Sequence, residues 1–162
     1  MIIVVIKKQD GTTVCIDGNS LRGACLDGVN LHRALIEDAD MSNSSLQGAD
    51  LRGASLSGTN FRQASFVGAQ LMTALLMEAD MTDSTLTSCN GQFAQFDRAI
   101  LVNADMSNSD WSGCCFDAAD LRGANISNCN LVDASFERAV YDKSTIFSEG
   151  FVFEGTGLVR DE

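Results

Sequence analysis

The chain has 162 residues, a formal net charge of −11 and no proline. Its length fits one compact domain, and its negative charge disfavours direct contact with nucleic-acid phosphate or an anionic membrane, because either would repel it. The apolar run at residues 2–6 is too short for a signal peptide or a membrane span, so we expect a cytoplasmic protein.

Residues 1–18 are expected to form a β-hairpin that caps the rest of the chain. Two β-branched runs, at 2–6 and 12–16, flank Asp10 and Gly11. This pair suits a two-residue type I′ turn, in which both central residues need positive φ. Such a hairpin would cover the apolar end and the open hydrogen-bonding edge of the first coil of a stack.

A five-residue phrase then recurs from residue 19 to residue 148 without insertion or deletion. The phrase Ala-Asp-Leu-Arg-Gly occurs at 49–53 and again at 119–123. Across twenty-six pentads the first residue is Ala, Ser or Cys in all but three, and the third is large and apolar in all but one, Gly91. A repeat of fixed period is typical of a solenoid rather than of separate helices or strands.

A period of five matches neither the 3.6 residues of a helical turn nor the alternation of a strand. A chain that bends once per pentad can place the first and third residues inward and leave the other three in water. Backbone hydrogen bonds would then join successive coils, about 4.8 Å apart as in a parallel sheet.

These pentads resemble the motif of the pentapeptide repeat proteins, roughly Ala-(Asp/Asn)-Leu-X-X. The resemblance implies an all-β fold, a right-handed quadrilateral parallel β-helix with four pentads per coil. On that basis Phe96, Phe116 and Phe136 stack on one face, and the repeat forms a rod about 31 Å long.

The end of the chain also resembles the short C-terminal cap of many family members. Residues 149–162 are expected to form this cap and its tail, so that residues 1–162 make a single pentapeptide-repeat domain. Phe147, Phe151 and Phe153 would cover the last coil, and the tail at 160–162 is expected to fray.

The repeat offers few groups for chemistry, and we expect no catalytic site, no cofactor and no metal. His32 stands alone at an outward fourth position. Asp40, Asp80 and Asp120 would share a face but lie in alternate coils, too far apart to bind one ion; with the nearby arginines Arg22, Arg62 and Arg122 they favour a solvated ladder of mixed charge.

The six cysteines show no metal-type spacing, and three of them replace the small first residue of a pentad. We interpret them as reduced thiols.

Two irregularities stand out in the repeat. Gly91 removes a large side chain from the column that contains Leu71 and Trp111, which predicts a cavity or a bulge unless the indole fills the space. Phe93 falls at an outward position and should lie over Thr73, next to Met72. An apolar patch is therefore a candidate protein contact or dimer contact, with a silent surface as the alternative; its residues are Met72, Leu75, Met77 and Phe93.

The leading functional interpretation is a non-enzymatic protein-binding or scaffold protein, monomeric or weakly dimeric, that presents the flat faces of a β-solenoid. Its protein partner is unknown from sequence. The alternative comes from the resemblance: some pentapeptide repeat proteins imitate the shape and charge of DNA, bind DNA gyrase and protect it from quinolones or peptide inhibitors.

Overall fold

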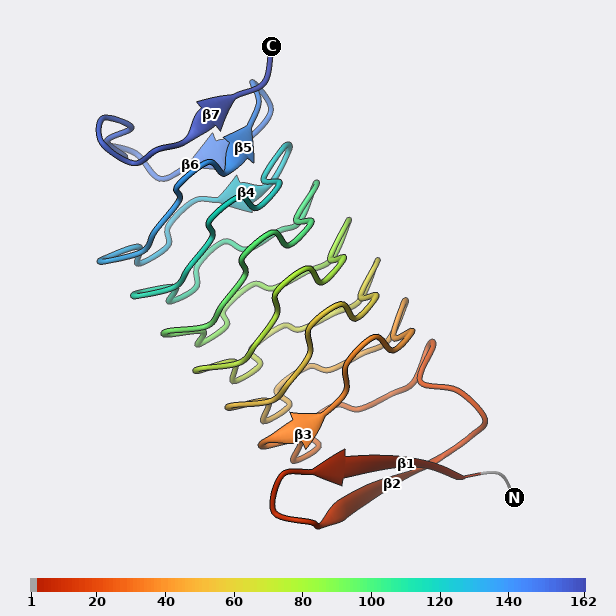
Figure 1. Cartoon of the computed structure of the whole chain (residues 1–162). Coiled ribbons are helices and arrows are strands. Elements are labelled where there is room, and N and C mark those ends of the chain that lie inside the picture. The colour runs from red at the N-terminus through yellow and green to blue at the C-terminus, as the bar shows by residue number, and fades with distance from the viewer. Residues whose placement is uncertain (1–2) are drawn as a thin grey trace.

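The computed structural model describes residues 3–162, and these contain strands and turns but no helix. They form a right-handed quadrilateral β-helix whose coils are stacked along one axis, with a hairpin at one end and short paired strands at the other (Figure 1). Parallel bridges join residues twenty apart, from Cys25–Ser45 to Asp120–Val140. The predicted coil of four pentads is confirmed.

The coil has four faces, each built from pentads twenty residues apart. We name them by the residue at the third position of each pentad. Face 1 has residues 21, 41, 61, 81, 101, 121 and 141; face 2 has 26, 46, 66, 86, 106 and 126; face 3 has 31, 51, 71, 91, 111 and 131; face 4 has 36, 56, 76, 96, 116 and 136.

Hydrogen bonds between coils follow the pentad. The third residue donates to the second residue of the next coil, as in Leu51 N–H to Gln70 O (2.8 Å), and the fifth donates to the fourth, as in Gly53 N–H to Met72 O (2.9 Å). The first residue of the following pentad, Ala54, donates back to Leu51 O (3.0 Å) and closes a turn. The turn bends the chain at every corner and leaves one donor, the fourth N–H, without a backbone partner in this pattern.

In many pentads an Asp or Asn side chain at the second position supplies the missing acceptor. The carboxylate of Asp110 accepts the N–H of Ser112 (3.0 Å), and Asn60 accepts that of Arg62 in the same way (3.1 Å). Asp and Asn carry an oxygen at the right reach for such a bond to the residue two ahead. This is the physical reason for the polar letter in the phrase Ala-Asp-Leu-X-X.

Every fifth residue from Gly23 to Arg138 has a left-handed backbone, with φ between 53° and 70°. Eight of these residues are glycine and sixteen are not. The turn requires this conformation, which costs free energy for residues with a Cβ. The bond that the fifth N–H donates to the next coil offsets this cost at most corners.

The interior is filled by the third and first residues, as predicted. Leu51, Phe66 and Phe116 are fully buried. On face 4, Phe96 stacks on Phe116 with ring centroids 5.0 Å apart, and Phe116 stacks on Phe136 at 5.2 Å. The predicted aromatic column is confirmed.

The gap at Gly91 is closed by Trp111 of the following coil. A Cβ added to Gly91 would overlap Cζ3 of the indole, so the ring occupies the space of the missing side chain. The buried indole donates to Met106 O (3.1 Å) and packs edge-on against Phe96. The indole therefore fills the gap, as the sequence allowed.

The hairpin covers the first coil, but its turn differs from the predicted one. Gly11 N–H donates to Lys8 O (3.0 Å), and Gly11 has a φ of 85°, whereas Asp10 does not have positive φ. The type I′ turn was therefore wrong, because Asp10 accepts the N–H and the hydroxyl of Thr12 and closes a three-residue loop. Ile2 lies outside the described residues. Strand β1 (Ile3–Lys8) pairs antiparallel with β2 (Thr13–Asp17) and with β3 (Ala34–Leu35).

The C-terminal cap leaves the twenty-residue register. Ile146 pairs with Asn125 instead of with the residue twenty positions away, so it is 53% exposed and Phe147 turns inward; the inward placement of Ile146 was wrong. The slip follows from a turn at Asp142, whose carboxylate accepts the N–H groups of Ser144 and Thr145. The cap strands are β4 (Asn125–Ile126) with β6 (Ile146–Phe147), and β5 (Val140–Tyr141) with β7 (Val159–Arg160).

Aromatic rings close the last coil, as predicted. Phe147 stacks on Phe151 with centroids 4.6 Å apart, and Phe153 stacks on Tyr141 at 5.3 Å. The expected fraying of the tail was wrong, because Asp161 N–H donates to Tyr141 O (2.7 Å) and the Asp161 carboxylate pairs with Arg122.

Candidate protein-contact surface

The surface of the rod is formed by the side chains at the second, fourth and fifth positions of each pentad. These side chains lie in straight columns along the stack. The patch predicted from sequence lies where faces 3 and 4 meet. Met72 is on face 3, and Leu75 and Met77 are on face 4; all three are half-buried, whereas Phe93 is 62% exposed.

Phe93 projects from a corner and leans along the stack. A Cβ added to Gly113 would lie 2.5 Å from two atoms of its ring, so the ring covers Gly113 in the following coil, away from Met72. The next residue along this edge is Val132, 64% exposed, whose carbonyl accepts Gly113 N–H (2.8 Å). The role of the four-residue patch in binding stays a prediction.

The sequence interpretation missed Val132. It occupies the fourth position of a face 3 pentad, in a column that also holds Arg52, Gln92 and Ser112. The same column also holds Met72 of the predicted patch, so a second apolar residue in it was the available signal. The twenty-residue period places Val132 two coils from Gln92, the neighbour of Phe93.

Face 4 carries a hollow of about 280 Å³ beside the predicted patch residue Met77. Its other lining residues are Glu37, Asp38, Ser57, Gly58, Glu78 and Arg98. The fourth residue is the small Ser57, and Gly58 has no side chain, so the surface is lowered between two coils that carry larger groups. The carboxylate of Asp38 leans over Gly58, where a Cβ would overlap its Oδ1.

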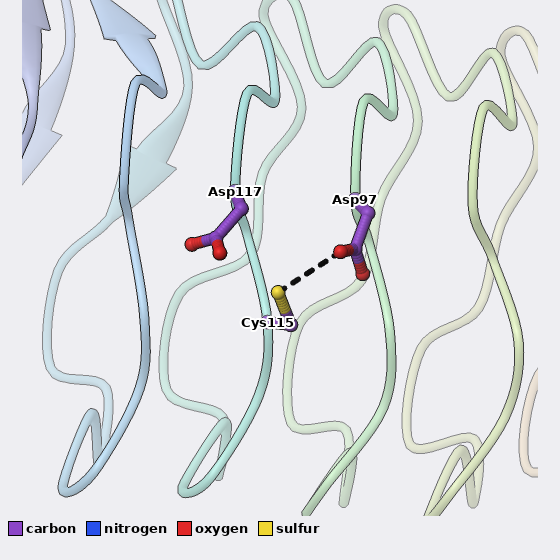
Figure 2. Close-up of side chains that lie close together, drawn as sticks. All are labelled: Asp97, Cys115 and Asp117. Atoms are coloured by element: carbon purple, nitrogen blue, oxygen red, sulfur yellow. Dashed lines mark hydrogen bonds between the residues drawn. The ribbon is translucent and has the colours of Figure 1, made fainter.

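Further along face 4 lies a group of three potential metal ligands, Asp97, Cys115 and Asp117, whose ligand atoms are within 4.8 Å of one another. Figure 2 shows the two carboxylates on successive coils, with the thiol directed at Asp97. Burial, and then the neighbouring Asp97, raise the pKa of the Cys115 thiol to about 11. The thiol is therefore protonated at neutral pH and donates to Asp97 (3.2 Å).

The same contact recurs on this face with hydroxyl groups, which explains the cluster as part of the fold. Ser55 donates to Glu37 and Ser135 donates to Asp117, each from the second position of one coil to the fourth position of the coil before. Cys115 makes this bond with sulfur. Asp117 also accepts Glu137 N–H (2.9 Å).

The charged ladder predicted for face 1 is present. Asp40, Asp80 and Asp120 lie in alternate coils, since each is bridged to the residue between them. Arg62 pairs with Asp80 at 3.1 Å and Arg122 pairs with Asp120 at 2.5 Å, with all four side chains partly exposed. Such solvated pairs contribute little to stability.

His32 is exposed, as expected.

All six cysteines are free. Cys89 and Cys114 are buried at first positions, where they donate to Phe66 O (3.1 Å) and Gly91 O (2.9 Å). Burial raises the pKa of both thiols to about 12, so neither is a nucleophile at neutral pH.

Within residues 3–162 no helix is long and apolar enough to cross a membrane.

The repeat geometry and the residues that fill it decide the family. The model of the Pentapeptide repeats family matches in eight copies, over residues 20–53, 39–76, 54–90, 74–113 and 99–138. The chain belongs to the pentapeptide repeat family.

Solved structures of other pentapeptide repeat proteins are similar to this chain. AT2G44920, from the thylakoid lumen of Arabidopsis thaliana, is 29% identical, with 63% of this chain and 68% of that chain covered and a TM-score of 0.49. Rfr23 from the cyanobacterium Cyanothece 51142 is 23% identical, with 77% and 88% covered and a TM-score of 0.37.

A trypsin-treated form of QnrB1, a plasmid-mediated fluoroquinolone resistance protein, is 19% identical, with 82% of this chain and 65% of that chain covered and a TM-score of 0.49. At this identity the likeness concerns the fold alone. No curated protein sequence matches the chain.

Proposed function

We propose that this pentapeptide repeat protein is a non-enzymatic binding or scaffold protein of the cytoplasm that recognises another protein through the flat faces of its rod. The observation that carries the proposal is the continuous ladder of bridges from Cys25 to Val140, which holds the side chains of each face at fixed spacing over the length of the stack. A rigid, regular surface of this kind suits a large partner rather than a small substrate.

The edge between faces 3 and 4 is the part of this surface that we expect to contact the partner. Phe93 holds its ring outward over Gly113, and the adjacent interior is already filled by other side chains. Exposed aromatic residues held in one place bind at low cost in conformational entropy and are common among the residues that dominate interfaces.

Pull-down from extracts of the source organism tests the proposal, with the wild-type protein as bait against the double variant Phe93→Ala/Leu75→Ala. Both side chains lie outside the buried core, so we expect the variant to keep its fold and to lose the captured protein. Val67→Ala, on face 2, is the matched control. Equal capture by all three baits would show that this edge does not contact the partner. If the wild-type bait captured no specific protein, protein binding itself would be contradicted.

The gyrase alternative has its own test. We expect the protein to leave gyrase supercoiling unchanged at micromolar concentration, with or without a quinolone, because the scaffold interpretation requires no imitation of DNA. Protection of gyrase from the drug in this assay would replace the scaffold interpretation by the alternative.

A further inference from the structure

Strand β2 of the hairpin pairs on one side only. The order of its sheet is β2–β1–β3, so β2 lies at the free edge, beyond β1 and away from the coils (Figure 1). Lys8 N–H donates to Thr12 O (2.9 Å), and alternate residues of a strand bond to opposite sides. The backbone groups of Thr13, Cys15 and Asp17 therefore point away from β1, and in the described part of the chain they have no backbone partner there.

The first coil leaves this edge open. A hollow of about 560 Å³ separates residues 15–17 of β2 from the loop at 18–25 that leads into the coil. Leu21 of the first coil is only half-buried, whereas Met41, one coil further on, is fully buried. The hairpin therefore covers the end of the stack in part and keeps its own outer edge accessible.

The edge also lacks the features that usually prevent pairing with another chain. Proteins protect such edges with proline, with lysine on the edge strand or with a β-bulge. Strand β2 reads Thr-Val-Cys-Ile-Asp, and its register with β1 runs from Thr13 to Asp17 without a bulge. Both lysines of the hairpin are on β1.

A second copy of β2 fits this edge in antiparallel register about a two-fold axis at Cys15. This register places Val14 opposite Ile16 of the second copy on the inner side, and Thr13 opposite its Asp17 on the outer side. Ile6 pairs with Val14 and both pack against the core, so the inner apolar row continues into the second copy. Like charges directly opposite each other destabilise a strand pair, and this register contains none.

The distribution of charge favours contact at this end of the rod. The side chains of residues 1–18 include two lysines and two aspartates, so the whole charge of −11 lies in residues 19–162. Two rods side by side would bring these negative charges together, whereas two rods joined at their hairpins keep them apart. The C-terminal end is less suitable, because residues 141–162 contain five acidic and two basic residues.

We propose that the protein forms a head-to-head dimer in which β2 pairs antiparallel with β2 of a second copy. The two hairpins then make one six-stranded sheet, and the two solenoids make one longer rod. A two-fold contact uses the same edge of both copies and is closed, so assembly stops at the dimer. The proposal goes beyond the protein-binding function and does not rest on it, because β2 and Phe93 lie in different parts of the rod.

Sedimentation velocity and small-angle X-ray scattering of the reduced protein test the proposal. We expect a dimer whose longest dimension is about twice that of the monomer, since the rods join end to end. Cys15→Lys places two ammonium groups opposite each other at the two-fold axis, and Thr13→Pro removes an edge N–H from each copy without a change of charge. Each variant should raise the dissociation constant of the dimer about five- to tenfold.

The matched control is Val5→Lys. Val5 is exposed and pairs with Cys15, so the variant carries the same charge on the same side of the hairpin, one strand away from the edge. Its dissociation constant should stay within about twofold of the wild-type value. Variants are compared only where thermal melts show that they fold.

Three outcomes would overturn the proposal. The first is a wild-type protein that stays monomeric up to millimolar concentration, and the second is a dimer no longer than the monomer, which would show association side by side. The third is a folded Thr13→Pro variant that dimerises as tightly as the wild type, or a Val5→Lys variant that weakens the dimer as much as Cys15→Lys does.

Discussion

The central coils and the C-terminal cap stack similar side chains under different constraints. In the coils each pentad is bridged to the one twenty positions away, and the third position stays buried and in register from Leu26 to Ile126, although Gly91 contributes no side chain there. In the cap, Asn125 pairs with Ile146 and Val140 with Val159, so one connection has gained a residue and the other has lost one.

The difference shows where the repeat obtains its regularity. A central coil is held from both sides, and a slip by one residue would turn its apolar side chains outward. The last coil has a neighbour on one side only, so side-chain bonds at Asp142 and contacts among aromatic rings decide its path. Substitutions in the coils and in the cap should separate these two sources of order.

The largest expected effect is in the central coils. Trp111→Ala empties the space of the indole and also the space that Gly91 leaves to it, so the free energy of unfolding should fall by about 3–5 kcal/mol. Gly91→Leu alone should also destabilise, because its Cβ would already collide with the indole. Chemical denaturation measures both, and the double variant Gly91→Leu/Trp111→Leu should recover most of the loss. A stable Gly91→Leu single variant would contradict the packing described.

A smaller loss is expected in the cap. Phe151→Ala removes a partly buried ring that contacts Phe136 and Phe147 and should cost about 1–2 kcal/mol. Because each coil contacts only its neighbours, amide hydrogen exchange should accelerate in the strands β4 to β7 and stay slow around residue 66. Uniform acceleration along the rod would show that the cap and the coils unfold as one unit.

A hydroxyl at the first position distinguishes two kinds of turn within the coils. Ser109 Oγ donates to Leu86 O (2.9 Å) and accepts Cys89 N–H (3.0 Å), so it replaces the usual turn bond of the coil before. Ser109→Ala should cost about 1–2 kcal/mol because both buried backbone groups lose their partner. Ser44 is the matched control: it is as deeply buried, its hydroxyl has no partner, and Ser44→Ala should be neutral or stabilising. Equal losses in denaturant melts would contradict this assignment.

The smallest effect concerns acid. Hydrogen bonds from the Ser144 hydroxyl and from the N–H groups of Gly123 and Ser144 lower the pKa of Asp142 from 3.8 to about 2. The folded state therefore favours the ionised carboxylate, so this contribution is present above pH 4 and is lost as the pH falls toward 2. Asp142→Asn should flatten the decline of the free energy of unfolding over that interval. An unchanged slope in denaturant titrations at several pH values would exclude Asp142 from the acid response.

The candidate contact surface was only partly predictable. The pentad register placed Met72, Leu75, Met77 and Phe93 outward, which follows from the position of each residue in its pentad. The direction of the Phe93 ring did not follow, because it depends on Gly113 in the next coil. The hollow at Met77 was hidden as well, since it arises from small residues twenty positions before that methionine.

The sequence alone determined the solenoid and its inward columns, because a strict five-residue period permits one way of burying the apolar positions. It also fixed the net charge. The coil of four pentads, and with it the stacking of Phe96 on Phe116, was predicted from the resemblance to the pentapeptide repeat proteins. Only the tertiary structure decided how Trp111 fills the space at Gly91 and how Asp142 shifts the register of the cap. These outcomes depend on contacts between residues about twenty apart, and the stacking of coils, rather than any local preference of the chain, brings those residues together.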